Sequence, residues 1–248
     1  THLVLLNRTS LGEKIKELER LGALSVEEHI VDLSQSASIS DFLAQWKSKP
    51  FDILVHNSGQ LTGGPFCDET FSHIRSMFDV NLLGPIQLTQ GLLPQLLKQK
   101  KGKIIFNASI SAAMYLPFAG PYAASKAGLM AICRSLQSEL KHTGVSTLLL
   151  LTPGIKTRMF DEIGEKYGKV LDVSSLNAIS PDEFAQQVID AIQKDRTEVT
   201  PNGFAYLGYL FARYFPNLFA TLSSLKIKDK NVNNHEGEKK RKGKAGNI

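Results

Sequence analysis

The sequence has few features of a disulfide-stabilised, metal-binding or membrane-spanning protein. Its 248 residues contain two cysteines, Cys67 and Cys133, which cannot form a disulfide framework and fit a reducing compartment. The six histidines are scattered without the short spacings of metal ligands, so no metal site is predicted. No apolar run reaches the roughly 18 to 20 residues needed to cross a bilayer. We therefore expect a protein of the cytoplasm.

Positive and negative charges are balanced over most of the chain. The net charge of +5 comes from residues 226–248, which carry eight Lys or Arg against three carboxylates, whereas residues 1–225 are balanced. A segment this polar cannot bury enough apolar surface to fold alone. We interpret 226–248 as a basic disordered tail. A nucleic-acid partner is not favoured, and contact of the tail with acidic lipids is an alternative.

Short apolar runs alternate with amphipathic segments, as in an α/β protein. Strands are predicted near residues 3–7, 26–32, 53–56, 103–107, 145–151 and 197–200, and helices near 11–21, 36–47, 68–78 running on towards 98, 121–141 and 181–194. A capping box from Ser10 to Glu13 is expected to open the first helix, and Ser180 followed by Pro181 the last. We predict one doubly wound parallel sheet within residues 1–202.

Residues 203–225 form the most aromatic stretch of the chain. Phe204, Leu207, Phe211 and Tyr214 recur at helical spacing, so this segment is predicted to be an amphipathic helix. Three interpretations stay open. The helix closes a substrate cleft, it is buried between two copies of the chain, or it lies in the plane of a membrane with the basic tail assisting.

Tyr122 and Lys126 stand four residues apart in a segment with helical patterning, so the phenol and the ammonium share one helix face. Bringing a tyrosine from its usual pKa of about 10 to neutrality takes about 4 kcal/mol of preferential phenolate stabilisation. An adjacent cation is the expected source. Such a pair alone is weak support for a catalytic site. However, Ser109 follows the predicted strand 103–107, and Pro153 and Gly154 follow the strand 145–151.

With Asn81 and Gly84 upstream, these elements resemble, in order, the N-x-x-G, Ser, Y-x-x-x-K and P-G motifs of the short-chain dehydrogenase/reductase family. The resemblance covers residues 2 to about 200 and implies a Rossmann-like fold. It also implies hydride transfer between a nicotinamide cofactor and a carbonyl or alcohol substrate. Tyr122 would act as general acid or base and Ser109 would bind the substrate oxygen. Lys126 would lower the pKa of Tyr122 and hold the ribose, and Asn81 would position a water.

The cofactor is expected to be NADP. The predicted strand 3–7 ends with Asn7 and Arg8 and has no carboxylate there, and an Arg at this point favours the 2′-phosphate. The resemblance further implies a set of cofactor contacts at Asp32, Leu33, Asn57, Ser58, Gly59, Tyr122, Lys126, Pro153, Gly154, Ile155 and Thr157. His56, which replaces an Asn of the family pattern, is interpreted as a core histidine.

The glycine-rich turn that opens the family's fold is missing from this sequence. That turn brings bare backbone to the cofactor pyrophosphate, and residues 1–8 supply no such glycines. We interpret the chain as truncated at its N-terminus by roughly 30 residues, a first strand and its helix. Either a gap or a forced direct pairing is then expected between the strands 3–7 and 53–56.

Two function hypotheses remain. The first is an NADP-dependent oxidoreductase of a small, lipophilic carbonyl or alcohol, working as a homodimer or homotetramer. The second is a catalytically silent truncated product that acts as a binding protein. The sequence does not identify the substrate, because residues 156–180, the expected lid, show no specificity pattern.

Overall fold

The computed structural model describes residues 1–46, 48–168, 170–173 and 178–228. Its main sheet has the strand order β3-β4-β5-β8, and all neighbouring pairs are parallel. The strands are β3 (Ile53–His56), β4 (Gly102–Asn107), β5 (Val145–Leu150) and β8 (Glu198–Val199). This arrangement confirms the parallel sheet that the sequence predicts.

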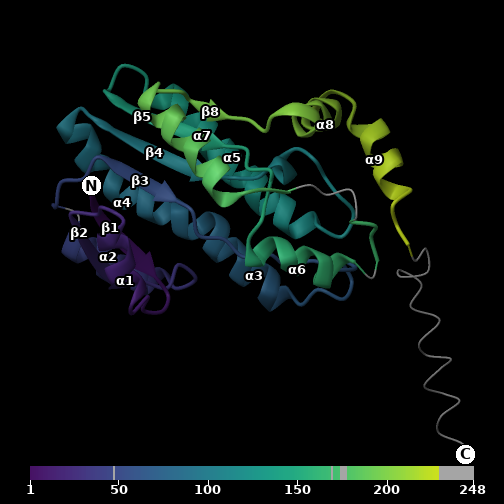
Figure 1. The fold of residues 1–248 in the computed structure, drawn as a ribbon, viewed down its shortest axis with the longest axis horizontal. Coiled ribbons are helices and arrows are strands. Elements are labelled where there is room, and N and C mark those ends of the chain that lie inside the picture. The colour runs from purple at the N-terminus through teal and green to yellow at the C-terminus, as the bar shows by residue number, and fades with distance from the viewer. Residues whose placement is uncertain (47, 169, 174–177, 229–248) are drawn as a thin grey trace, which may run out of the picture.

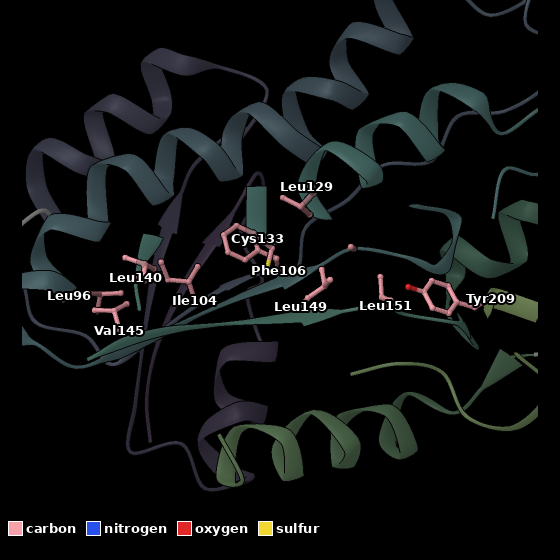
Figure 2. Close-up of a cluster of buried hydrophobic side chains, with 11 residues drawn as sticks. Leu96, Ile104, Phe106, Leu129, Cys133, Leu140, Val145, Leu149, Leu151 and Tyr209 are labelled. Atoms are coloured by element: carbon pink, nitrogen blue, oxygen red, sulfur yellow. The ribbon is translucent and has the colours of Figure 1, made fainter. Parts of the chain in front are cut away.

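Helices cover both faces of the main sheet (Figures 1 and 2). Along β4, Ile104 and Phe106 pack into a core with Leu129 and Cys133 of α5. Ile105, between them, packs instead with Phe184 and Ala191 of α7, because successive strand residues point to opposite faces. The central strands are therefore buried on both sides and mostly apolar, as a doubly wound sheet requires.

Most helices lie close to the expected segments, but Arg158–Tyr167 is helical within the expected lid, where no helix is predicted, and residues 203–225 form two helices instead of one. They are α1 (Lys14–Arg20), α2 (Ser36–Trp46), α3 (Phe71–Phe78), the π-helical turn η1 (Asp79–Leu83), α4 (Gly84–Gln99), the 3-10 turn η2 (Ile110–Ala112), α5 (Gly120–Glu139), α6 (Arg158–Tyr167), α7 (Pro181–Gln193), α8 (Gly203–Tyr214) and α9 (Pro216–Ser224).

One of the two predicted helix caps forms. Ser180 accepts a hydrogen bond from the backbone N–H of Glu183 at 3.1 Å, as expected at the start of α7. The capping box at Ser10 is wrong, since α1 begins at Lys14 and its N-cap residue makes no side-chain cap bond. Ser10 instead donates to the Glu28 carboxylate at 2.7 Å, because the fold places β2 beside this turn.

A second sheet pairs β1 (His2–Asn7) with β2 (Ser25–Ile30), again in parallel. Among the described residues, no ladder joins β1 to β3, so of the two expected outcomes the structure shows the gap and not the direct pairing. Val4, Ile53 and Val55 at these strands are 38%, 43% and 53% exposed. Such open edges with exposed apolar side chains favour pairing with another strand. A missing first strand remains a prediction.

The C-terminal segment is attached to the main core. Tyr209 of α8 is 2% exposed and belongs to the same buried cluster as Phe106 and Leu149 (Figure 2). Beyond α9, residues 226–228 pair with residues 170–172, so the basic segment predicted to be a disordered tail from residue 226 begins with an ordered piece. Residues 229–248 lie outside the described part of the chain.

Candidate active site

The candidate catalytic residues gather at the carboxyl edge of the main sheet. Ser109 follows β4 and opens η2, while Tyr122 and Lys126 lie in the first two turns of α5. Because the strands are parallel, their carboxyl ends meet at one edge, and the loops that follow them converge there. The predicted site is therefore assembled from separate parts of the chain.

The Ser109 side chain lies near the Tyr122 hydroxyl and favours the ionised form of the phenol. Ser109 Oγ accepts from the backbone N–H of Ser111 at 3.1 Å, which fixes the serine at the start of η2. Burial raises the pKa of Tyr122, and the Ser109 side chain opposes this only in part. At neutral pH the phenol therefore keeps its proton.

Lys126 is 4% exposed, and its Nζ donates to the backbone carbonyl of Asn107 at 2.9 Å. Burial lowers the pKa of Lys126 to about 8. Its Nζ lies 6.0 Å from the centroid of the Tyr122 ring. The expectation that Lys126 lowers the pKa of Tyr122 is wrong for this structure, because desolvation of the buried phenol dominates and the pKa rises.

Asn81 is fully buried in η1 and clamps the loop after β3. Its Oδ1 accepts from the Gln60 N–H at 2.7 Å, and its Nδ2 donates to the Gln60 carbonyl at 2.9 Å and to Ser125 Oγ at 3.1 Å. Gly59 lies between Asn81 and Lys126, since a Cβ placed there would be 3.5 Å from both side chains. The four predicted catalytic residues thus surround one region. The water expected at Asn81 remains a prediction.

Sequence reasoning missed Asn107 as the residue that connects these parts. Its Nδ2 donates to Asn57 Oδ1 at 2.7 Å, and its Oδ1 accepts from Thr152 Oγ1. Its backbone carbonyl is the acceptor for Lys126. Asn107 therefore ties the ends of β3, β4 and β5 to α5. The available signal was a polar residue at the end of an otherwise apolar strand, two residues before Ser109.

The residues predicted to read the adenosine part of the cofactor lie at the ends of β1 and β2. Asn7 donates to Glu28 at 3.1 Å. The Asp32 carboxylate accepts from the Ser34 hydroxyl at 2.7 Å and from its N–H at 2.8 Å. These bonds, with a smaller contribution from the charge of Arg8, lower the pKa of Asp32. The backbone carbonyl of Leu33 lies close to Gly84, which has no room for a Cβ.

Glu28 belongs to β2, which pairs with β1. Its carboxylate lies beside β1, and the sequence did not reveal this because the two strands are far apart in the chain. Glu28 accepts from Asn7, from Ser10, and from the Leu11 N–H at 2.8 Å. These donors lower its pKa and occupy both its oxygens. Glu28 is therefore committed to holding the turn that follows β1.

The remaining predicted contacts lie after β3 and β5. Asn57 and Ser58 are exposed, whereas Pro153, Gly154 and Ile155 are half-buried, the last two in the short strand β6 (Gly154–Ile155), which pairs with β7 (Ala178–Ile179). Thr157 is exposed at the start of α6, and its Oγ1 donates to the Ile155 carbonyl at 3.2 Å. The structure brings these residues to the edge that carries Lys126.

His56 is a core residue, as expected. Its Nε2 is 2.8 Å from Thr89 Oγ1, and its ring centroid is 5.1 Å from that of Phe106. Burial lowers the pKa of His56 to about 3, so the imidazole is neutral. Within the described residues, no cluster of His, Cys, Asp or Glu could hold a metal ion, and no helix is long and apolar enough to cross a membrane.

Helix α6 lies next to the candidate site and is held by two side chains that sequence reasoning missed. Lys166 Nζ and the Tyr167 hydroxyl each donate at 2.6 Å, to the backbone carbonyls of Leu61 and Thr62. The Tyr167 ring occupies the space that a Cβ of residue 63 would need, so glycine is required there. Tyr167 belongs to an apolar cluster that also contacts Tyr122.

Comparisons with known proteins place this geometry in context. The family model described as short chain dehydrogenase matches residues 1–168. The Dehydrogenase/reductase SDR family member 7B of Xenopus laevis is 28% identical over 242 residues, covering 92% of this chain and 75% of the relative.

Two solved structures share the fold. A metagenomic short-chain oxidoreductase in complex with NADP is 26% identical, with a TM-score of 0.64, over 81% of this chain and 85% of that one. A short-chain dehydrogenase from Sphingobium yanoikuyae in complex with NADPH has a TM-score of 0.72 at 19% identity, over 88% of this chain and 85% of that one.

Proposed function

We propose a reversible carbonyl reduction for this chain, which belongs to the short-chain dehydrogenase family. The observation that carries the proposal is the proximity of the Ser109 and Tyr122 hydroxyls, together with the buried amine of Lys126. Two adjacent hydroxyls can both donate to one carbonyl oxygen as charge develops on it. The reaction is transfer of a hydride between NADP(H) and a carbonyl or alcohol.

In the proposed mechanism, Tyr122 donates its proton to the substrate oxygen during reduction and accepts it during oxidation. General acid catalysis of this kind supplies about 10² to 10⁴ in rate. Ser109 donates a second hydrogen bond to the same oxygen. When bound, the nicotinamide supplies or accepts the hydride. The raised pKa of Tyr122 keeps it in the acid form at neutral pH, which favours the direction of reduction.

The residues around Lys126 fit a dinucleotide cofactor. A protonated lysine has three donors, and one of them is used by the Asn107 carbonyl, which leaves donors for ribose hydroxyls. The missing side chain of Gly59 leaves open the space next to Lys126 Nζ. Asn57, Ser58 and Pro153 to Thr157 would line the rest of this edge.

We further propose NADP(H) rather than NAD(H). Arg8 is exposed at the end of β1, where a guanidinium can pair with a 2′-phosphate. The one nearby carboxylate of β2, Glu28, is occupied by three donors and so is not free to accept from a ribose hydroxyl. The bound NADP and NADPH of the two similar structures support this choice.

The substrate is proposed to be apolar next to its carbonyl. The cluster that contacts Tyr122 contains Leu61, Ala119, Tyr167 and Leu171, which supply apolar surface next to the tyrosine. Loss of NADPH absorbance with a panel of aldehydes and ketones of increasing chain length tests the proposal. Turnover should rise with apolar length. A catalytically silent binding protein would consume no NADPH with any of them.

A membrane surface is the partner proposed for α8 and α9. Phe204, Leu207 and Tyr214 form an exposed stripe on α8, and Leu218 and Leu222 do so on α9. Residues 203–228 carry Arg213, Lys226 and Lys228 but no carboxylate, so this region complements acidic lipids. Apolar side chains beside cations are typical of helices that lie in the interface plane.

Anionic vesicles should therefore bind the protein in a salt-sensitive way. Vesicles of phosphatidylserine and phosphatidylcholine should bind it at low salt at least about tenfold better than phosphatidylcholine alone. Replacing both Leu207 and Leu218 with serine should abolish binding to the anionic vesicles. The same change at Leu21 and Leu24, two exposed leucines distant in sequence from α8 and α9, should not affect it. If the first variant instead converts a homodimer or homotetramer to a monomer, the face is an interface between copies.

A further inference from the structure

Two segments far apart in the sequence form a short antiparallel pairing beside the candidate site. The Asp172 N–H donates to the Lys226 carbonyl at 2.8 Å, and the Lys228 N–H donates to the Val170 carbonyl at 2.9 Å. Leu171 and Ile227 are the bridged pair between these bonds. Lys228 Nζ adds a bond of 2.8 Å to the Gly168 carbonyl, directly after α6. Residues 226–228 are called the strap below.

The strap brings an apolar side chain to the wall of the substrate region. Ile227 packs against the cluster formed by Leu61, Ala119, Tyr167 and Leu171. Tyr122 packs against the same cluster. Leu171 and Tyr167 are each 4% exposed, so the cluster is closed on the side where the strap lies. Ile227 and the proposed catalytic tyrosine therefore pack against the same apolar group.

The strap and α6 are parts of one cover. At its carboxyl end, α6 is joined by Lys166 and Tyr167 to the loop after β3. Just beyond α6, the strap bonds to the carbonyls of Gly168 and Val170 and to the Asp172 N–H, and it pairs with Leu171. Removing the strap would leave those backbone groups without their partners and would uncover Leu171. The position of α6 and the strap next to the cluster that contacts Tyr122 thus depends on a segment that follows α9.

We propose that the strap fixes the cover of the substrate region and that Ile227 is a specificity-determining residue for substrates with an apolar chain. The proposal rests on the proposed carbonyl reduction for the identity of the substrate, but the pairing of the strap with residues 170–172 does not. Apolar substrates gain from contact with Ile227 and Leu171 in proportion to the surface they bury there. Small carbonyl compounds do not reach this wall and gain nothing.

Two shortened proteins separate the strap from the rest of the C-terminal segment. One ends at Lys228 and keeps the strap, and the other ends at Leu225 and lacks it. Hydrogen exchange of the Asp172 amide should be unchanged in the first and at least about tenfold faster in the second, because its acceptor, the Lys226 carbonyl, is gone. Equal exchange in both proteins would overturn the pairing, whatever reaction the protein catalyses.

Point variants of the full chain test specificity. Ile227→Ala should raise KM for a long-chain aldehyde about tenfold and leave kcat/KM for a short-chain aldehyde unchanged. Leu225→Ala, two residues away but exposed, should change neither value. Equal loss with both aldehydes, or no loss with either, would overturn the role of Ile227. Absence of turnover in the unaltered protein would refute the carbonyl reduction and with it this role, while the exchange result would still decide the pairing.

Discussion

Replacing Tyr122 with phenylalanine is expected to lower kcat for carbonyl reduction by at least about a hundredfold. The change removes the hydroxyl near Ser109 and leaves the ring, which packs in the apolar cluster near Tyr167. The shape of the substrate region is therefore kept and the proton donor is lost. Affinity for NADPH, measured by fluorescence titration, should change less than about threefold.

Tyr115 provides the matched control for this experiment. It is exposed, it belongs to the loop between η2 and α5, and its replacement by phenylalanine removes an equivalent hydroxyl. Tyr115→Phe should have an activity close to that of the unaltered protein. An activity of Tyr122→Phe within tenfold of that protein would exclude Tyr122 as the general acid.

Replacing Arg8 with aspartate should weaken binding of NADPH by about 1.5 to 3 kcal/mol, or roughly 10- to 100-fold, because a charge-assisted pair with the 2′-phosphate is lost. Binding of NADH, which has no such phosphate, should change little. The measurement is isothermal titration with both cofactors. Arg20→Asp, a charge reversal at the end of α1, is the control and should affect neither.

Equal losses for NADPH and NADH in the Arg8 variant would show that Arg8 does not distinguish the two cofactors. An aspartate at this position would also lie near the carboxylate of Asp32, so Arg8→Gln is a useful second variant. Arg8→Gln should also weaken binding of NADPH more than binding of NADH, with a smaller effect than Arg8→Asp. A loss restricted to the aspartate variant would indicate repulsion between carboxylates as its cause.

Much of the fold could be predicted because its signals are local. Short stretches of sequence suffice to recognise the apolar runs of β3, β4 and β5 and the helical periodicity of α5. The positions of Ser109 after a strand and of Tyr122 and Lys126 on one helix face follow from the same signals. The parallel order then brings them to one edge without further information.

Other features could not be predicted because they depend on contacts between distant segments. Asn107 joins three strands to Lys126, and Glu28 holds the turn after the neighbouring strand β1. The direction of the Tyr122 pKa shift depends on how deeply the fold buries the phenol, which no spacing reveals. The strap was missed because residues 226–228 belong to a basic, polar stretch whose pairing partner lies after α6.

The most direct test of the proposed reaction is the fate of the transferred hydrogen. NADPH carrying deuterium at both hydrogen positions of the reactive nicotinamide carbon is incubated with the protein and a long-chain aldehyde, and the alcohol product is analysed by mass spectrometry. Hydride transfer predicts an alcohol carrying one deuterium on its carbinol carbon, formed by the unaltered protein and hardly at all by Tyr122→Phe. An alcohol without the label, or no alcohol with any aldehyde or ketone tested, would contradict the account.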